Sequence, residues 1–281
     1  MPTAAATAEL ERLLHDDVPA GDLTTDALGI GERPGRMRFA ARHAMTLALV
    51  DDAVAILRLA GAAVTVAARA GETLAPGDVI LVAEGAASAL LRGWKVAQTL
   101  IEVWSGVASD TAAIVAAART AHPDVAVACT RKTVPGTKPF AVAAVRAGGG
   151  AMHRLGLSET ILVFPEHRGF LAGEPLGETV ARLRRAAPER RLVVEVGSVA
   201  DGVDAARAGF DVIQAEKFPP AEIARLAAAL AALAPRPLLA AAGGIDAGNA
   251  AAYAAAGAYV LVTSAPYQAK PRDVAVTIVP A

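Results

Sequence analysis

Residues 192–264 read LVVEVGSVADGVDAARAGFDVIQAEKFPPAEIARLAAALAALAPRPLLAAAGGIDAGNAAAYAAAGAYVLVTS and repeat one pattern. Short apolar runs at 192–196, 212–215, 238–242 and 259–262 alternate with alanine-rich segments of helical character. Each run has the length of a buried strand, and each intervening segment has the period of an amphipathic helix. Repeats of this kind predict parallel strands joined by crossover helices.

The same pattern continues toward the N-terminus. Apolar runs at 125–129 and 160–164 add two strands, and helices are expected at 139–147, 176–187, 199–208, 220–233 and 246–256. The later repeats are only about twenty residues long, which suits an incomplete α/β barrel. A doubly wound open sheet is the competing architecture. No GxGxxG follows a strand, which weakens its dinucleotide-binding version.

The first hundred residues have a different, mixed pattern. We expect a helix at 5–15, a turn-rich segment at 16–26, strands at 36–40, 46–50, 63–67 and 79–83, a turn within 70–79, a helix at 51–61, and one long helix or two abutting helices over 88–120. This predicts an N-terminal α/β sandwich domain at 1–106 and a barrel domain at 107–267. The segment 268–281 is expected to return to the sandwich.

Composition excludes several classes of protein. The 281 residues are 54% hydrophobic and 20% charged, with a formal net charge of −1, so a large core is expected and nucleic acid is not an expected partner. Cys129 is the only cysteine, so no internal disulfide forms. The first nine residues lack the pattern of a signal peptide, and charged residues interrupt the longer apolar stretches. We therefore expect a cytoplasmic protein without a membrane span.

Charged and glycine residues collect where the predicted strands end. In parallel α/β folds the working residues lie at the carboxyl ends of the strands. These ends read Thr130-Arg131-Lys132, Phe164-Pro165-Glu166-His167, Glu195, Glu216-Lys217, Gly243-Gly244 and Thr263-Ser264. Residues 131–168 hold six Lys or Arg and two acids, an excess of 6 − 2 = +4 in a nearly neutral chain. Such a concentration predicts a small anionic ligand, with a solvated basic face as the alternative.

Glu195 and Glu216 lie 21 residues apart, one strand–helix repeat. Carboxylates on neighbouring strand ends can bind a metal–pyrophosphate or stabilise a developing cation. Their alternative role is to pair with a structural Lys or Arg. The Gly243-Gly244 and Thr263-Ser264 ends lie late in the barrel, where backbone N–H groups often cradle a phosphate.

Several blocks together resemble the quinolinate phosphoribosyltransferase family. TRKTVPGTKPF at 130–140 and AVRAGGGAMHRLGLSETILV at 144–163 are similar to its signature. The blocks AGDLTTD (20–26), GWKVAQTLIEVWSGVAS (93–109), EVGS (195–198), DVIQAEKF (211–218) and AAGGI (241–245) match it in order and spacing.

The resemblance implies a sandwich plus incomplete barrel, and a homodimer, or a higher oligomer built from it, with active sites shared between subunits. It implies phosphoribosyl transfer from phosphoribosyl pyrophosphate with Mg²⁺, as in nicotinate-nucleotide pyrophosphorylase of NAD biosynthesis. Glu195 and Glu216 would be catalytic and hold Mg²⁺ through pyrophosphate, with Lys132 also catalytic. The implied substrate-binding residues are Lys95, Arg131, Lys132, Lys138, His153, Arg154 and Phe164, and the implied phosphate-binding residues are Gly243, Gly244, Thr263 and Ser264.

Some positions depart from the family pattern. Phe164 replaces a lysine that faces the acceptor, Glu216 replaces an aspartate, and Ala240 stands where a glutamate is usual. These variants resemble the ModD branch, which is associated with molybdate-transport loci. The acceptor is therefore quinolinate or a smaller, less charged aromatic acid. The alternative is a non-catalytic barrel that binds an anion such as molybdate.

Overall fold

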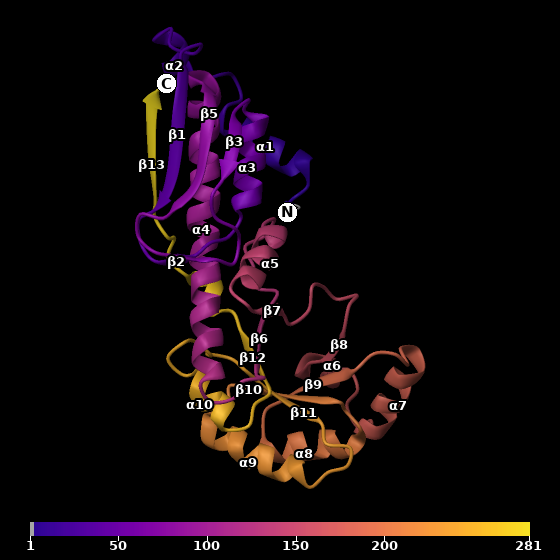
Figure 1. The fold of residues 1–281 in the computed structure, drawn as a ribbon. Helices are drawn as coiled ribbons and strands as arrows, with labels where there is room; N and C mark the ends of the chain where they lie inside the picture. The colour runs from indigo at the N-terminus through magenta and orange to yellow at the C-terminus, as the bar shows by residue number, and fades with distance from the viewer. Residues whose placement is uncertain (1–2) are drawn as a thin grey trace. The chain divides into compact units, whose positions relative to one another are not determined.

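The computed structural model describes residues 3–281, which form two compact units (Figure 1). Unit 1 holds the residues up to 112 together with 133–149 and 266–281. Unit 2 holds 113–132 and 150–265. The chain therefore passes from unit 1 into unit 2, returns to unit 1 for residues 133–149, enters unit 2 again, and ends in unit 1.

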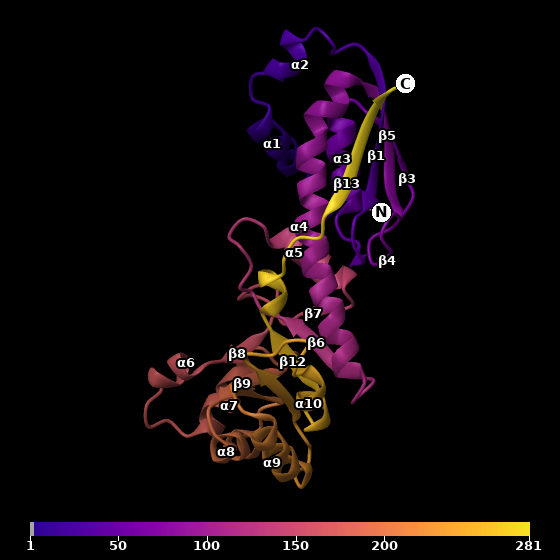
Figure 2. The same cartoon turned by 90° about the vertical axis from the view of Figure 1, so that its left-hand side faces the viewer.

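Unit 1 is built on an antiparallel sheet of order β13-β1-β5-β3. Its strands are β1 (Pro34–Ala41), β3 (Ala63–Val66), β5 (Val79–Ala86) and β13 (Val274–Pro280), and a small separate pair joins β2 (Met45–Thr46) to β4 (Thr73–Leu74). Buried residues alternate along β1, so one face of the sheet packs on helices (Figure 2). The C-terminal segment returns to this unit, since β13 pairs with β1.

The helices of unit 1 differ from expectation at their ends. They are α1 (Thr7–Asp17), α2 (Leu23–Ala27), α3 (Val50–Leu59), α5 (Lys138–Ala147) and the first part of α4 (Ala87–Arg119). The expected turn-rich segment contains α2, because Asp22 accepts hydrogen bonds from the N–H groups of Thr24 and Thr25. The strand expected at 46–50 was wrong beyond Thr46, since Leu49 adopts a left-handed φ of 54° and α3 starts at the next residue.

Helix α4 is one continuous helix, which settles the choice between one helix and two. By length and composition alone it could cross a membrane, with a mean hydropathy of 1.3 over its most apolar window. However, 56% of that window is buried inside the protein. A Cβ atom on Gly106 would lie 2.4 Å from the Lys270 carbonyl oxygen, so the C-terminal segment packs directly on the helix. These contacts are those of a core helix.

Unit 2 is a parallel sheet of order β7-β6-β12-β11-β10-β9-β8. The strands are β6 (Ala126–Cys129), β7 (Ala151–Met152), β8 (Ile161–Val163), β9 (Leu192–Val196), β10 (Val212–Glu216), β11 (Leu238–Ala242) and β12 (Val260–Thr263). Successive strands are neighbours, and β12 closes back onto β6. Among the described strands, the two edge strands β7 and β8 do not pair with each other, so the barrel is not closed. This confirms the incomplete barrel and excludes the doubly wound sheet, which would need a reversal of strand order.

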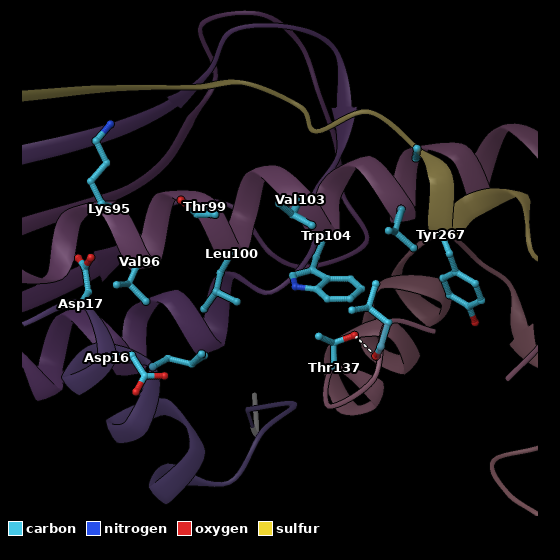
Figure 3. A pocket seen from close by; sticks show the side chains of 14 residues that line it. Asp16, Asp17, Lys95, Val96, Thr99, Leu100, Val103, Trp104, Thr137 and Tyr267 are labelled. Carbon is cyan, nitrogen blue, oxygen red and sulfur yellow. Dashed lines mark hydrogen bonds between the residues drawn. The ribbon is translucent and has the colours of Figure 1, made fainter. Parts of the chain in front are cut away.

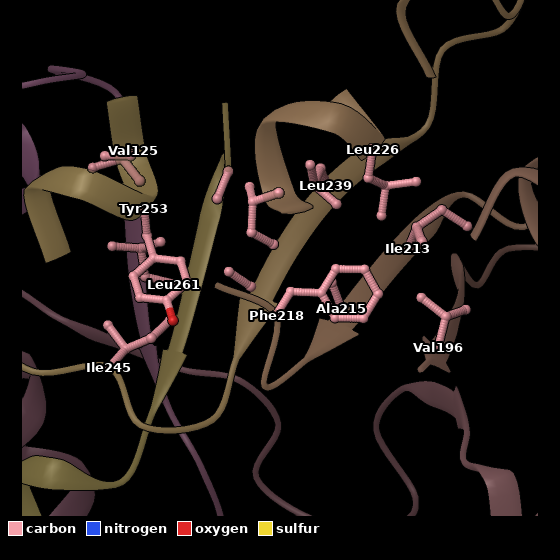
Figure 4. Close-up of a cluster of buried hydrophobic side chains, with 14 of the residues drawn as sticks. Val125, Val196, Ile213, Ala215, Phe218, Leu226, Leu239, Ile245, Tyr253 and Leu261 are labelled. Atoms are coloured by element: carbon pink, nitrogen blue, oxygen red, sulfur yellow. The ribbon is translucent and has the colours of Figure 1, made fainter. Parts of the chain in front are cut away.

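The strands divide their side chains between two environments. Ile213 and Ala215 of β10, with Leu239 of β11, face an apolar cluster under the outer helices (Figure 4). Those helices are α7 (Leu176–Ala186), α8 (Val199–Ala208), α9 (Pro220–Ala231) and α10 (Ala250–Ala255). Because side chains alternate along a strand, Gln214 and Glu216 point into the barrel. The outward face thus stabilises the fold and leaves the inward face for chemistry.

Two short elements and one boundary escaped sequence reasoning. Strand β7 and helix α6 (Pro165–Gly169) were not expected. The helix expected at 246–256 begins only at Ala250, because Asp246 and Asn249 form a hydrogen-bonded turn: Asp246 N–H donates to Asn249 Oδ1 over 3.0 Å, and Gly248 N–H donates to Asp246 Oδ1 over 2.8 Å. Side-chain hydrogen bonds of this kind compete with helix formation.

Candidate active site

A pocket of about 540 Å³ lies at the carboxyl ends of the barrel strands in unit 2. It brings together all the barrel residues singled out from the sequence: Arg131, Lys132, His153, Arg154, Phe164, Glu195, Glu216, Gly243, Gly244, Thr263 and Ser264. They come from the ends of all seven strands of the sheet, spread over more than 130 residues of chain. Topology alone assembles them, because every parallel strand ends at the same edge of the barrel.

Two carboxylates form the acidic side of this pocket. Glu195 lies on β9 and Glu216 at the end of the neighbouring strand β10. Burial raises the pKa of Glu195, and the negative charges of Glu216 and Glu166 raise it further, while a hydrogen bond from Gln214 and the charge of Lys132 oppose them. Glu216 has an ion-pair contact of 4.0 Å to Lys217. The two carboxylates therefore lie close enough for the charge of Glu216 to act on Glu195, and Glu216 also has the lysine contact that the structural alternative expects.

Arg154 forms the basic side and is only 6% exposed. Its burial and the nearby charge of Arg131 lower its pKa. Among residues 3–281 no carboxylate forms an ion pair with this guanidinium, whose carbon lies 5.4 Å from the centre of the Phe164 ring. A buried cation without a partner is costly, so this one is suited to receive an anion.

His153 and Phe164 line the same pocket. Burial, and then the charge of Arg154, lower the pKa of His153, which keeps its imidazole neutral. Phe164 stacks on His167 with ring centres 5.9 Å apart and an interplanar angle of 15°. Its backbone N–H donates to His167 Nδ1 over 3.0 Å, which fixes the start of α6. An aromatic face therefore stands beside the unpaired arginine.

The glycine-rich loop has the geometry of a close backbone approach. Gly243 and Gly244 have φ values of 91° and 71°, a region that favours glycine. The Thr263 hydroxyl donates to the Ile245 carbonyl oxygen over 2.6 Å and accepts from the Ala265 N–H over 3.0 Å. This hydroxyl joins the loop after β11 to the loop after β12. These loops present mainly backbone atoms and the Ser264 side chain to the pocket.

Four lining residues were not among the strand ends named from the sequence: Leu162, Gln214, Ala242 and Val262. Glu166 and Lys217 were named there but were given no role. Lys217 is a non-glycine residue with a positive φ of 57°. Such strain is often found at functional sites. Gln214 is a polar residue inside an apolar strand, and that was the available signal, because a buried amide needs partners.

Lys95 and Lys138 belong to unit 1 and do not line the barrel pocket. Lys95 lies 4.3 Å above the Trp94 ring and lines a mostly apolar groove of about 600 Å³ with Trp104 and Tyr267 (Figure 3). Asp16 and Asp17 lie at the same end of this groove (Figure 3). Lys138 opens α5 and lines a separate cavity of about 680 Å³.

The acidic side fits a magnesium ion that is bound mainly through a substrate. No group of three or more His, Cys, Asp or Glu side chains within residues 3–281 has the arrangement of a self-contained metal site. Mg²⁺ commonly uses one or two carboxylates and completes its shell with water and substrate phosphates. Glu195 and Glu216 are such a pair, so they would hold the ion only with a phosphorylated ligand.

Comparison with known proteins connects this pocket to a family. The sequence profiles for the N-terminal and C-terminal domains of quinolinate phosphoribosyl transferase match residues 22–105 and 107–277. A ModD pyrophosphorylase of Rhodobacter capsulatus is 51% identical over 244 residues, 86% of this chain and 93% of its own. A carboxylating nicotinate-nucleotide pyrophosphorylase of Mycobacterium leprae is 32% identical over 267 residues, 93% and 92% of the two chains.

A solved structure shows the same fold. The crystal structure of NadC from Streptococcus pyogenes superposes with a TM-score of 0.89 at 26% identity. The match covers 98% of this chain and 96% of that one.

Proposed function

The chain belongs to the quinolinate phosphoribosyltransferase family, a family of pentosyltransferases, and we propose that it transfers the phosphoribosyl group of phosphoribosyl pyrophosphate to an aromatic carboxylic acid, releasing pyrophosphate. The observation that carries this proposal is one pocket that contains two neighbouring acids and a buried arginine without an acidic partner. An anion sensor has no use for the two acids.

The acidic side suits the ribose centre. Displacement of pyrophosphate leaves positive charge at the ribose C1 atom, and nearby carboxylates stabilise such a charge. Glu195 and Glu216 take this role, and both would also hold Mg²⁺, which neutralises pyrophosphate when it is bound. The Gly243-Gly244 loop offers backbone N–H groups, and Ser264 a hydroxyl, to the phosphates.

The basic side positions the acceptor acid. Arg154 and Arg131 face its carboxylate, Lys132 adds a further cation, and the Phe164 ring takes the aromatic face. Because Phe164 supplies no charge, a monocarboxylate fits this side better than quinolinate does. Losing one charge-assisted hydrogen bond costs about 1.5–3 kcal/mol, roughly 10- to 150-fold in affinity.

The proposal includes a homodimer, to which unit 1 contributes the contact surface. A homodimer would use the apolar groove around Trp104, and Lys95 at the edge of that groove would reach the site of the second subunit. Val103, 36% exposed, and Val134, 60% exposed, line this groove and are expected to become buried on assembly. A single free cysteine suits the reducing cytoplasm, where we place the protein.

The test is a pyrophosphate-release assay on the purified protein with phosphoribosyl pyrophosphate and Mg²⁺, offering quinolinate and nicotinate separately. Release that depends on either acid supports the proposal. Lys132→Glu should abolish it without unfolding the protein, whereas Lys270→Glu, an exposed lysine outside the pocket, should leave it unchanged. Activity retained in Lys132→Glu would remove that residue from the mechanism.

The second candidate is a non-catalytic barrel that binds an anion such as molybdate. The buried Arg154 favours it, since a guanidinium without an acidic partner suits any small anion. Isothermal titration with molybdate, in the wild type and in Glu195→Gln, tests this alternative. Tighter anion binding in the variant, with no pyrophosphate release for any acid, would favour the alternative over the transferase.

A further inference from the structure

The lysine and arginine side chains that line the barrel pocket are distributed unevenly among the strand ends. Arg131 and Lys132 follow β6 and Arg154 follows β7, two neighbouring strands at one edge of the sheet. Lys217 follows β10, which β11 and β12 separate from β6. Among the described residues that line the pocket, it is the one lysine or arginine at the ends of β8 to β12. A ligand with two anionic groups therefore meets cations on two separate parts of the barrel.

Lys217 has a backbone conformation that its surroundings do not explain. Its φ of 57° lies in the left-handed region, which glycine and asparagine adopt more readily than lysine. Leu49 is the other non-glycine residue with a positive φ in the described chain, and it is buried at the start of α3, so packing accounts for it. The Lys217 side chain is 80% exposed, so packing does not account for a lysine here. Unfavourable backbone conformations of this kind often belong to functional residues.

This conformation places the Lys217 side chain against the glycine loop. The Lys217 N–H donates to the Ala242 carbonyl oxygen over 2.7 Å, and a Cβ on Gly243 would lie 2.8 Å from Lys217 Cγ. Neither the Gly243 N–H nor the Gly244 N–H donates to another backbone group within residues 3–281. The Lys217 ammonium group lies 4.0 Å from Glu216 Oε1, which is longer than a hydrogen bond. The ammonium group and the loop N–H groups are therefore donors at one end of the pocket.

A phosphate group matches these donors. It has three strong acceptor oxygens, and glycine-rich loops and lysine side chains are common partners for them. The Ser264 hydroxyl lines the same pocket from the next strand end, β12. The carboxylate of Glu216 would repel a phosphate placed here, and the positive charge of Lys217 offsets that repulsion. A lysine thus does at this position what an uncharged asparagine or glycine, with the better backbone fit, would not do.

We propose that Lys217 is a further substrate-binding residue, which holds a phosphate group together with the Gly243-Gly244 loop and Ser264. The inference deepens the proposed transferase function and rests on it for the identity of the ligand, phosphoribosyl pyrophosphate. That ligand carries phosphate oxygens at two places, the phosphomonoester of the ribose and the pyrophosphate. The chemistry that Lys217 recognises is common to both, and the experiment separates them.

The experiment is titration calorimetry of the full-length protein with ribose 5-phosphate and, separately, with inorganic pyrophosphate and Mg²⁺. Lys217→Asn should bind at least one of these ligands about 10- to 150-fold more weakly than the wild type, because a charge-assisted contact is lost. Lys217→Arg keeps the charge and should stay within about 3-fold for the same ligand. A loss confined to ribose 5-phosphate assigns Lys217 to the phosphomonoester, and a loss confined to pyrophosphate assigns it to the leaving group.

Two controls separate this role from a structural one. Lys270→Asn removes an exposed lysine outside the pocket and should leave both affinities unchanged. Lys217→Asn should also raise Tm by about 1–3 °C, because asparagine tolerates a positive φ better than lysine does. If Lys217 served only to pair with Glu216, its replacement would lower Tm and leave both affinities unchanged.

The inference is overturned if Lys217→Asn binds both phosphate ligands as tightly as the wild type, or if neither ligand binds the wild type. It fails separately from the transferase. Weaker phosphate binding in Lys217→Asn, with no pyrophosphate release by the wild type for any acid, would contradict the transferase and leave Lys217 as a phosphate ligand. Pyrophosphate release by the wild type with an unchanged KM for phosphoribosyl pyrophosphate in Lys217→Asn would support the transferase and contradict the role of Lys217.

Discussion

Lys217 folds the stem of its side chain over Gly243, so that a Cβ atom on Gly243 would lie 2.8 Å from Lys217 Cγ. The same Cβ would approach Glu216 Oε1 to 3.1 Å and the Lys217 backbone nitrogen to 3.3 Å. The glycine thus makes room for a lysine with a positive φ, beside Glu216, which we propose as a catalytic acid. The conformation of the Gly243-Gly244 loop and that of the end of β10 therefore depend on each other.

The first prediction compares alanine at the two loop glycines. Gly243→Ala and Gly244→Ala should each lose about 1–2 kcal/mol of unfolding free energy, because both residues have positive φ. Only Gly243→Ala displaces Lys217 and Glu216, since nothing lies within 4 Å of a Cβ on Gly244. Titration calorimetry with phosphoribosyl pyrophosphate should therefore show a loss of more than about 10-fold for Gly243→Ala and a smaller loss for Gly244→Ala. Equal losses would contradict the crowding argument.

A second prediction contrasts a paired with an unpaired arginine. Arg168 forms a 2.8 Å ion pair with Asp201, whereas Arg154 is buried beside Arg131 without an acid. Arg168→Met should therefore lower the free energy of unfolding by about 1 kcal/mol, and Arg154→Met should raise it by a similar amount. Urea unfolding measures both. Arg154→Met should also weaken binding of the acceptor acid about 10- to 150-fold. Destabilisation by Arg154→Met would show that its charge is satisfied after all.

The third prediction concerns the pH dependence of stability. Burial raises the pKa of Glu195 above its ordinary value of 4.5. Between the unfolded and folded pKa values the folded protein holds a proton that the unfolded chain lacks, so its stability falls as pH rises through that window. Glu195→Gln removes this slope and should be more stable than the wild type above the window, by up to about 1 kcal/mol, while losing activity. Urea unfolding from about pH 4 to pH 8 tests this. Parallel profiles for the two proteins would contradict it.

The fourth prediction separates two helical glycines that look alike in sequence. Gly106 in α4 faces the Lys270 carbonyl oxygen at 2.4 Å from a built Cβ, whereas nothing lies within 4 Å of a Cβ on Gly177 in α7. Gly106→Ala should destabilise by about 1–3 kcal/mol, and Gly177→Ala should stabilise by about 0.4–1 kcal/mol. Thermal unfolding of the two variants shows whether each substitution raises or lowers the stability. Stabilisation by both variants would mean that the C-terminal segment can leave α4 at no cost.

Local sequence patterns explain why part of the fold could be predicted, and long-range contacts such as that of Gly106 explain why part could not. The barrel follows from a repeat of apolar strands and amphipathic helices, and each repeat is a local pattern that sequence displays directly. The return of 268–281 to the sandwich was expected, but its pairing with β1 and the packing of Lys270 on Gly106 depend on contacts between residues far apart in the chain. The end of the strand expected at 46–50 depends on one left-handed residue, Leu49, whose conformation no periodicity reveals.

The residues of the pocket likewise include some that could be predicted from the sequence and some that could not. Residues at the carboxyl ends of the strands, such as Glu195 and Glu216, were predictable because parallel topology brings all strand ends together. Gln214 was missed, although its polar side chain interrupts an apolar strand, since its hydrogen bond to Glu195 depends on the register of two strands. Lys217 was placed at a strand end but given no role, because its distinguishing feature is a positive φ that the sequence does not display. Sequence thus locates the pocket, and the structure shows how its members constrain one another.

The last prediction restores the charge that Phe164 lacks. Phe164→Lys would place an ammonium group beside Arg154 and should raise the affinity for quinolinate about 10- to 150-fold, because a second carboxylate then finds a cation. Phe164→Met is the matched control, since it removes the ring and adds no charge. Both variants lose the stacking on His167, so both should be less stable than the wild type, and the lysine variant more so through repulsion from Arg154. Titration of the three proteins with quinolinate and nicotinate separates charge from shape. If the lysine and methionine variants bind quinolinate equally, position 164 does not face the second carboxylate, and the acceptor lies elsewhere in the pocket.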